Sequence, residues 1–246
     1  HDLILMTGSP EFEEVWFDQG GLMPDGAKTI QLCSAASRAA FKFPVSLSLL
    51  GDLKTSIGSI LRHLKTTAGK VYEADSIARN EALAIKHLAN VTASEARLKS
   101  QWDYQPMTPA RAIWEISSAI PKGTIVVDES ITASVEIAAG FEFSSPGDYF
   151  GGRGGGIGQG IPGALGVKVA HMARPVLCTS GDGSAMYSIQ ALWTAAHHDL
   201  AIVFVIFSNK EYRVLKHNID IYRNRFGQTS NKPYPHMDLM HPMLGF

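Results

Sequence analysis

The sequence has almost no net charge. Its 22 Lys and Arg nearly balance its 23 Asp and Glu, which gives a formal charge of −1 at pH 7. No general basic field is therefore available for nucleic acid or for an anionic membrane, and we expect neither as a partner. A phosphate bound by such a protein must be held locally, by a metal ion, a helix start or a glycine loop.

The sequence is also poor in cysteine and in long apolar runs. Its two cysteines, Cys33 and Cys178, each lie in an apolar, strand-like segment, which indicates buried, reduced thiols. The longest apolar run, residues 200–207, is too short to cross a bilayer. The first residues show no signal-peptide pattern. By default we expect a cytoplasmic protein.

The composition is that of a globular protein. Of its 246 residues, 45% are hydrophobic and 18% are charged, enough for one large domain or two ordinary ones. The chain starts at His1 directly in a strand pattern, and its last residues show no closing element. We therefore expect a piece of a longer protein.

The first 105 residues divide into a small α/β unit and a connector. Residues 2–8 and 28–34 have strand patterns, and residues 52–64 have helical spacing behind Asp52 as N-cap. Residues 65–105, rich in Ala, Lys, Glu and Ser, predict a helical connector, in which Thr92 and Glu95 have the spacing of a capping box.

From Thr108 onward, strands and helices alternate. Thr108 and Pro109 have the pattern of an N-cap and first turn. The strands are near-continuous apolar runs, which favours an α/β fold with a parallel sheet covered by helices on both faces. The predicted strands are residues 124–128, 175–180 and 201–208, and the predicted helices include residues 109–120, 162–173 and 185–198.

Polar residues follow three of these strands: Asp128-Glu129, Gly181-Asp182-Gly183 and Ser208-Asn209. Sites in parallel sheets lie beyond the carboxyl ends of the strands, so we expect these residues to meet in one crevice. A carboxylate, an amide oxygen and backbone carbonyls suit a magnesium ion that also binds a diphosphate. A helix start adds only about 0.3–1 kcal/mol, so the metal should supply most of the affinity.

These motifs resemble a known family. GDGS followed by SN, together with GGGIGQGIPGALGV and GDGSAMYSIQALWTAA, is similar to the thiamine-diphosphate-dependent 2-oxo acid decarboxylases and carboligases, closest to the benzoylformate decarboxylase and acetolactate-synthase-like members. The resemblance implies the thiamine-diphosphate-binding fold. It assigns residues 1–65 to the C-terminal part of a Rossmann-like middle domain, 66–105 to a helical linker and 106–246 to a truncated diphosphate-binding domain.

The resemblance also implies thiamine diphosphate and Mg²⁺ as cofactors. Asp182 and Asn209 would ligate the metal through their side chains, and Glu211 only through its backbone carbonyl. Ile157 would wedge beneath the cofactor, and the backbone of Gly155 would meet its aminopyrimidine. The implied cofactor-binding residues are Thr132, Gly155, Gly156, Ile157, Gly181, Gly183, Ser184, Tyr187 and Tyr212.

The implied reaction is decarboxylation of a small 2-oxo acid, through attack of the cofactor's ylid on the keto carbonyl. The family works as a homodimer or homotetramer, with the cofactor at the subunit interface. Its activating glutamate belongs to an N-terminal domain, so no catalytic residue is assigned here, and these residues alone are predicted to be inactive.

Two positions depart from the benzoylformate decarboxylase pattern. Val15 replaces a catalytic histidine, and Asn218 replaces a pocket aromatic. The identity of the 2-oxo acid, and the choice between decarboxylation and acetolactate-synthase-like carboligation, therefore stay open.

Two alternatives of other classes remain. Residues 158–163 fit the dinucleotide pattern G-x-G-x-x-G, which is weak alone. A non-catalytic assembly module is the other alternative; the paired Asp182 and Asn209 argue against it, since a scaffold has no need of metal ligands.

Overall fold

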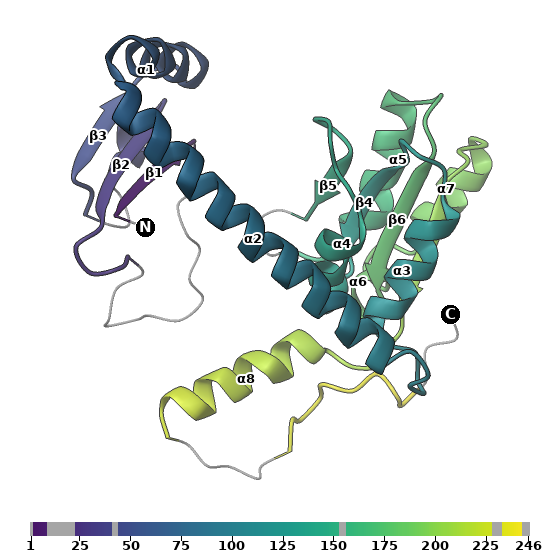
Figure 1. The fold of residues 1–246 in the computed structure, drawn as a ribbon. Helices are drawn as coiled ribbons and strands as arrows, with labels where there is room; N and C mark the ends of the chain where they lie inside the picture. The colour runs from purple at the N-terminus through teal and green to yellow at the C-terminus, as the bar shows by residue number, and fades with distance from the viewer. Residues whose placement is uncertain (1, 9–22, 41–43, 153–155, 228–232, 243–246) are drawn as a thin grey trace. The chain divides into compact units, whose positions relative to one another are not determined.

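The computed structural model describes residues 2–8, 23–40, 44–152, 156–227 and 233–242. The chain forms two compact units, His1–Ala89 and Asn90–Phe246 (Figure 1).

The first unit contains a three-stranded parallel sheet. Its strands β1 (Leu3–Thr7), β2 (Lys28–Cys33) and β3 (Leu47–Leu50) are adjacent in that order. The two predicted strands are confirmed, and β3 was missed. A short 3₁₀ turn, η1 (Ala36–Arg38), lies between β2 and β3.

Two helices follow this sheet. The predicted cap of α1 (Leu53–Thr67) is confirmed, because an Asp52 carboxylate oxygen accepts a hydrogen bond from Thr55 N at 2.8 Å. Helix α2 (Lys70–Ser100) runs without a break. The predicted capping box at Thr92 and Glu95 is wrong, because both residues lie inside α2, where the backbone N–H groups already have helical partners. The boundary between the two units falls within α2.

The second unit contains a four-stranded parallel sheet with the order β5-β4-β6-β7. Its strands are β4 (Ile125–Glu129), β5 (Tyr149–Gly151), β6 (Val176–Gly181) and β7 (Val203–Phe207). The three strands predicted for this region are confirmed, and so is the α/β class. The short edge strand β5 was not predicted.

Helices cover both faces of this sheet (Figure 1). Ile125 and Val127 of β4 pack in one core with α5 (Gly160–Ala170). Val126, between them, points to the other face and packs with α3 (Pro109–Ala119) and α4 (Ser134–Gly140). Side chains alternate across a strand, so a strand buried on both faces is apolar throughout. This explains the unbroken apolar pattern of the sequence.

The predicted helix over residues 185–198 is broken in the structure. It consists of α6 (Asp182–Ala185) and α7 (Ala191–His197). Between them, backbone N–H groups donate to the carbonyl three residues earlier, as in tight turns. Examples are Tyr187 N to Ser184 O and Ala191 N to Ser188 O. The apolar spacing of this segment does not distinguish such tight turns from an α-helix.

The chain continues from β7 into α8 (Arg213–Arg225). Just before α8, Tyr212 N donates to Met237 O at 2.9 Å, and Leu239 N donates to Lys210 O at 2.7 Å. The segment after β7 is therefore paired with residues 237–239. Among the described residues, no helix has both the length and the apolar character needed to cross a membrane.

Candidate cofactor site

A cavity of about 670 Å³ lies where β4, β6 and β7 end. Its walls come from the turn after β4, which includes the 3₁₀ helix η2 (Ile131–Ala133), from the start of α6, and from the segment between β7 and α8. Ile157 of the glycine loop and the residues at the start of α3 complete it. A crevice at the strand ends is therefore present, as predicted, but the prediction that Asp128 and Glu129 line it is wrong.

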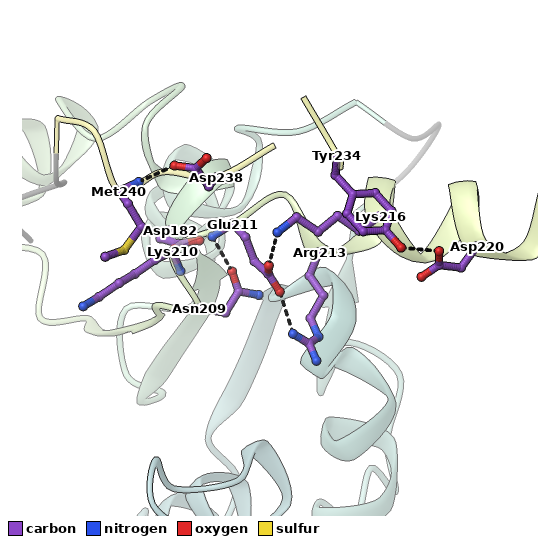
Figure 2. Close-up of polar contacts among 10 residues, drawn as sticks. All are labelled: Asp182, Asn209, Lys210, Glu211, Arg213, Lys216, Asp220, Tyr234, Asp238 and Met240. Atoms are coloured by element: carbon purple, nitrogen blue, oxygen red, sulfur yellow. Dashed lines mark hydrogen bonds and ion pairs between the residues drawn. The ribbon is translucent and has the colours of Figure 1, made fainter. Parts of the chain in front are cut away.

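Asp182 is the buried carboxylate of this cavity and is 2% exposed. Its Oδ1 accepts a hydrogen bond from Gly183 N at 2.8 Å. Its Oδ2 accepts from Lys210 N at 2.7 Å (Figure 2). The same oxygen accepts from Ser208 Oγ at 3.2 Å. These bonds join the ends of β6 and β7. All three donors are uncharged, so they orient the carboxylate without neutralising it.

Asn209 is the second member of the ligand pair predicted from the sequence. Its Oδ1 accepts a hydrogen bond from Glu211 N at 3.0 Å (Figure 2). An amide oxygen has two lone pairs, so this turn leaves one for another partner. Both Asp182 and Asn209 line the cavity.

The Glu211 carboxylate binds cations of the chain itself. It accepts hydrogen bonds from Lys216 Nζ and, at 2.5 Å, from an Arg213 guanidinium nitrogen (Figure 2). The pKa of Glu211 is lowered, chiefly by the hydrogen bond from Lys216 and also by that from Arg213, although burial acts in the opposite direction. Within the described ranges there is no cluster of three or more His, Cys, Asp or Glu side chains suited to a metal. A metal at Asp182 would need oxygens from amides, carbonyls, water or a ligand.

Most of the predicted site residues meet at this cavity. Gly156 and Tyr187 do not line it, and the Tyr187 side chain is 61% exposed. Gly155 and Val15 lie outside the described residues. Asn218 lies in α8 and is not among the lining residues. Those that line the cavity are Thr132, Ile157, Gly181, Asp182, Gly183, Ser184, Asn209, Glu211 and Tyr212.

Sterics explain why the second residue after β6 in the Gly-Asp-Gly turn, Gly183, is a glycine. A Cβ on Gly183 would lie 2.9 Å from Tyr212 Cε1, closer than such atoms approach. Gly183 therefore lets the Tyr212 ring pack directly on the turn that carries Asp182. Its role is close approach, because its φ is not in the left-handed region.

Asp128 lies in the protein interior and does not line the cavity. It accepts hydrogen bonds from Ser130 N at 2.9 Å, Thr179 Oγ1 at 2.8 Å and Tyr149 OH at 3.1 Å. Burial raises the pKa of Asp128, but hydrogen bonds, chiefly from Ser130, outweigh it, and the pKa is lowered. Asp128 thus shapes the turn after β4. Ile131 in that turn has φ 56°, a strained conformation for a β-branched residue.

Glu129 is also buried, at 2% exposure, and its carboxylate fills the amino end of α5. It accepts hydrogen bonds from the N–H groups of Gly158, Gln159 and Gly160 at 2.8, 3.1 and 2.8 Å. A dinucleotide pyrophosphate would need these same N–H groups. The G-x-G-x-x-G pattern therefore serves an internal carboxylate, a contact that sequence reasoning missed.

Comparison with known proteins identifies the domain. Residues 132–244 match the family model described as thiamine pyrophosphate enzyme, C-terminal TPP binding domain. Over these residues the chain is therefore similar to the thiamine pyrophosphate enzymes. Thiamine pyrophosphate, which is thiamine diphosphate, is the cofactor of this family.

Relatives and solved structures extend the likeness to the rest of the chain. Benzoylformate decarboxylase of Pseudomonas aeruginosa is 32% identical over 216 residues, which are 88% of this chain and 37% of that protein. The acetolactate synthase large subunit of Buchnera aphidicola is 31% identical over 134 residues, 53% of this chain and 23% of that protein. The chain thus spans little more than a third of the length of the first relative.

The fold likeness is broader than the sequence likeness. The thiamine diphosphate-dependent 4-hydroxybenzoylformate decarboxylase of Rhodococcus jostii RHA1 superposes with a TM-score of 0.68 at 24% identity. The superposition covers 97% of this chain and 40% of that structure. Both parallel sheets therefore belong to a fold used by thiamine-diphosphate-dependent enzymes.

Proposed function

We propose that this chain is the cofactor-binding part of a thiamine diphosphate- and Mg²⁺-dependent enzyme that decarboxylates a small 2-oxo acid. One observation carries the proposal. The buried Asp182 carboxylate, at the end of β6, is held by Lys210 N beyond the end of β7, on the wall of a cavity of about 670 Å³. The domain assignment of residues 1–65, 66–105 and 106–246 is part of the same proposal.

The residues present fit a magnesium ion. The Asp182 carboxylate lies at the cavity wall and accepts hydrogen bonds from two backbone N–H groups and a hydroxyl, none of which is a cation. We assign metal ligation to the side chains of Asp182 and Asn209 and to the backbone carbonyl of Glu211. Mg²⁺ prefers such oxygen ligands and usually completes its shell with phosphate and water. We exclude the Glu211 carboxylate from the metal ligands, because it already binds Lys216 and Arg213.

The remaining cavity residues suit the organic part of the cofactor. The cavity lining combines the apolar Ile157 with polar residues such as Thr132 and the buried Ser184. When bound, thiamine diphosphate supplies the electron sink for decarboxylation, and the chain supplies binding and orientation. Contacts from Gly155, Gly156, Gly181, Gly183, Tyr187 and Tyr212 complete the proposed site. We propose a homodimer or homotetramer for the whole enzyme, on the basis of the family resemblance.

Carboligation is the second candidate. It is supported by the 31% identity to an acetolactate synthase large subunit over 134 residues. Both reactions share the cofactor site and differ in what captures the decarboxylated product. Analysis of products from the whole enzyme with one 2-oxo acid, and then with a second carbonyl compound, distinguishes them. Cofactor binding without any turnover in the whole enzyme would favour the non-catalytic module instead.

Calorimetric titration of the chain with thiamine diphosphate tests the cofactor site. We expect saturable binding that requires Mg²⁺, and no binding of NAD. Asp182→Asn should weaken Mg²⁺-dependent binding by more than about 100-fold, since loss of even an outer partner of a metal ligand costs roughly 10–100-fold.

The matched control is Glu211→Gln, which changes a nearby carboxylate that binds Lys216 and Arg213. We expect its affinity to stay within about threefold of the unsubstituted chain, since only its backbone is assigned to the metal. Equal losses in both variants would refute the ligand assignment. Unchanged binding in Asp182→Asn would refute the proposed site.

A further inference from the structure

Glu129 is a buried carboxylate that the proposed chemistry does not use. It is 2% exposed, does not line the cavity, and directs both oxygens at the start of α5. Oε1 accepts hydrogen bonds from Gly158 N and Gln159 N, and Oε2 accepts one from Gly160 N. Three consecutive backbone donors therefore depend on one side chain.

The glycine loop is built around this carboxylate. A Cβ on Gly160 would lie 2.7 Å from Glu129 Cβ and 2.9 Å from Oε2, so only glycine lets the carboxylate reach the backbone. Gly158 has φ 96°, a conformation that favours glycine. Residues 158–160 thus match Glu129 in both shape and hydrogen bonding.

The contact joins two walls of the cavity. On one side, Ser130 and Ile131, the two residues after Glu129, line the cavity. On the other side, Ile157, directly before the bound N–H groups, lines it as well. Any movement of residues 158–160 away from β4 would carry Ile157 out of its place.

We propose that Glu129 is a positioning residue, which fixes residues 158–160 to β4 and thereby holds Ile157 in the wall of the cofactor cavity. This inference rests on the proposed function, since the effect that it predicts is on cofactor affinity. Glu129 itself touches neither the cavity nor a reacting group.

A carboxylate is required because both of its oxygens accept hydrogen bonds. In Glu129→Gln, one oxygen becomes an NH₂ group that faces a backbone N–H donor. At least one buried N–H then loses its acceptor, and the loop must shift to relieve the contact between two donors.

The first test measures amide hydrogen exchange of residues 158–160 in the full chain without cofactor. These amides should be protected in the unsubstituted chain. In Glu129→Gln they should exchange at least about tenfold faster. A tenfold change corresponds to about 1.4 kcal/mol, and the net contribution of a hydrogen bond to a charged group is larger than that.

The control is Lys168→Met at the other end of α5, where Nζ donates to Met172 O and Arg174 O, both at 2.8 Å. That buried charge stabilises the fold but lies away from the cavity, so its loss should lower the melting temperature and leave these three amides protected.

The second test is a double-mutant cycle on thiamine diphosphate affinity with Mg²⁺. Ile157→Ala changes a partly exposed side chain, so the variant should fold. Both Glu129→Gln and Ile157→Ala should weaken binding by roughly tenfold, and their effects should not add, because one acts through the other. Lys168→Met should bind normally.

The outcomes separate the two proposals. Failure of the unsubstituted chain to bind thiamine diphosphate would refute the proposed function, while the exchange measurement would still report on the Glu129 contact. Normal binding by Glu129→Gln or by Ile157→Ala would refute this inference alone. Additive effects of the two substitutions, or unchanged exchange at residues 158–160, would overturn it as well.

Discussion

At the residue scale, neighbouring polar residues at the strand ends have different roles. Asp182 lines the cavity, whereas Asp128 and Glu129 do not line it and accept their hydrogen bonds inside the protein. In the sequence all three are acidic residues after an apolar strand. What separates them is the set of donors around each. The donors to Asp182 come from α6 and from the segment after β7. Those to Asp128 come from β5, β6 and the turn after β4, and those to Glu129 come from residues 158–160.

Cys178 gives a test of burial at this scale. Its thiol is fully buried, and burial, with nearby Glu129 and Asp128, raises its pKa to about 12. An unfolded thiol ionises near pH 8.5. The contribution of this thiol to stability is therefore complete below about pH 8.5, and is lost as the pH rises toward 12.

Urea unfolding of the chain and of Cys178→Ala, at pH 8 and at pH 10, measures this contribution. The loss of unfolding free energy between the two pH values should be larger in the unsubstituted chain. The same pH dependence in both proteins would contradict the prediction. In the folded chain, neither Cys178 nor Cys33 should react with a thiol reagent, because both are buried.

At the element scale, periodicity predicted most of the long elements, but it missed the 13-residue helix α8 and the short strands β3 and β5. Strands β3 and β5 have four and three residues, too few to show an alternation. The helix predicted over residues 185–198 is divided because tight turns replace its α-helical bonds. The glycine loop packs closely on these turns, since a Cβ on Gly158 would lie 2.6 Å from Tyr187 Cβ.

The glycines of α5 give a test at this scale. Gly160→Ala should destabilise the chain by about 1–3 kcal/mol, because its Cβ would overlap Glu129. Gly163→Ala lies one turn further along α5, where no atom comes within 4 Å of an added Cβ. It should stabilise the chain by roughly 0.5–1 kcal/mol. Chemical denaturation measures both, and a loss of stability in Gly163→Ala equal to that in Gly160→Ala would contradict the steric explanation.

At the scale of the whole molecule, the cavity and its candidate ligands all belong to the second unit, Asn90–Phe246. The first unit carries its own parallel sheet. A cofactor that binds only the folded second unit stabilises that unit by mass action.

Differential scanning calorimetry tests this division. At 100 times its dissociation constant, a ligand adds about 2.7 kcal/mol, which corresponds to roughly 5–10 °C for a unit of this size. Thiamine diphosphate with Mg²⁺ should raise one unfolding transition by that amount and leave the other unchanged. Equal shifts of both transitions would mean that the two units unfold together, or that both contact the ligand.

The sequence by itself determined the α/β class, the alternation of strands and helices, and the position of Asp182 and Asn209 at strand ends that line one cavity. These follow from local patterns, because an apolar strand, a glycine turn and a polar strand end each depend on neighbouring residues. Only the tertiary structure decided that Glu129 fills the amino end of α5, that Glu211 is held by Lys216 and Arg213, and that residues 237–239 pair with the segment after β7. Those contacts join side chains and backbone groups whose partners are chosen by packing, and a buried carboxylate is defined by the donors that packing brings to it.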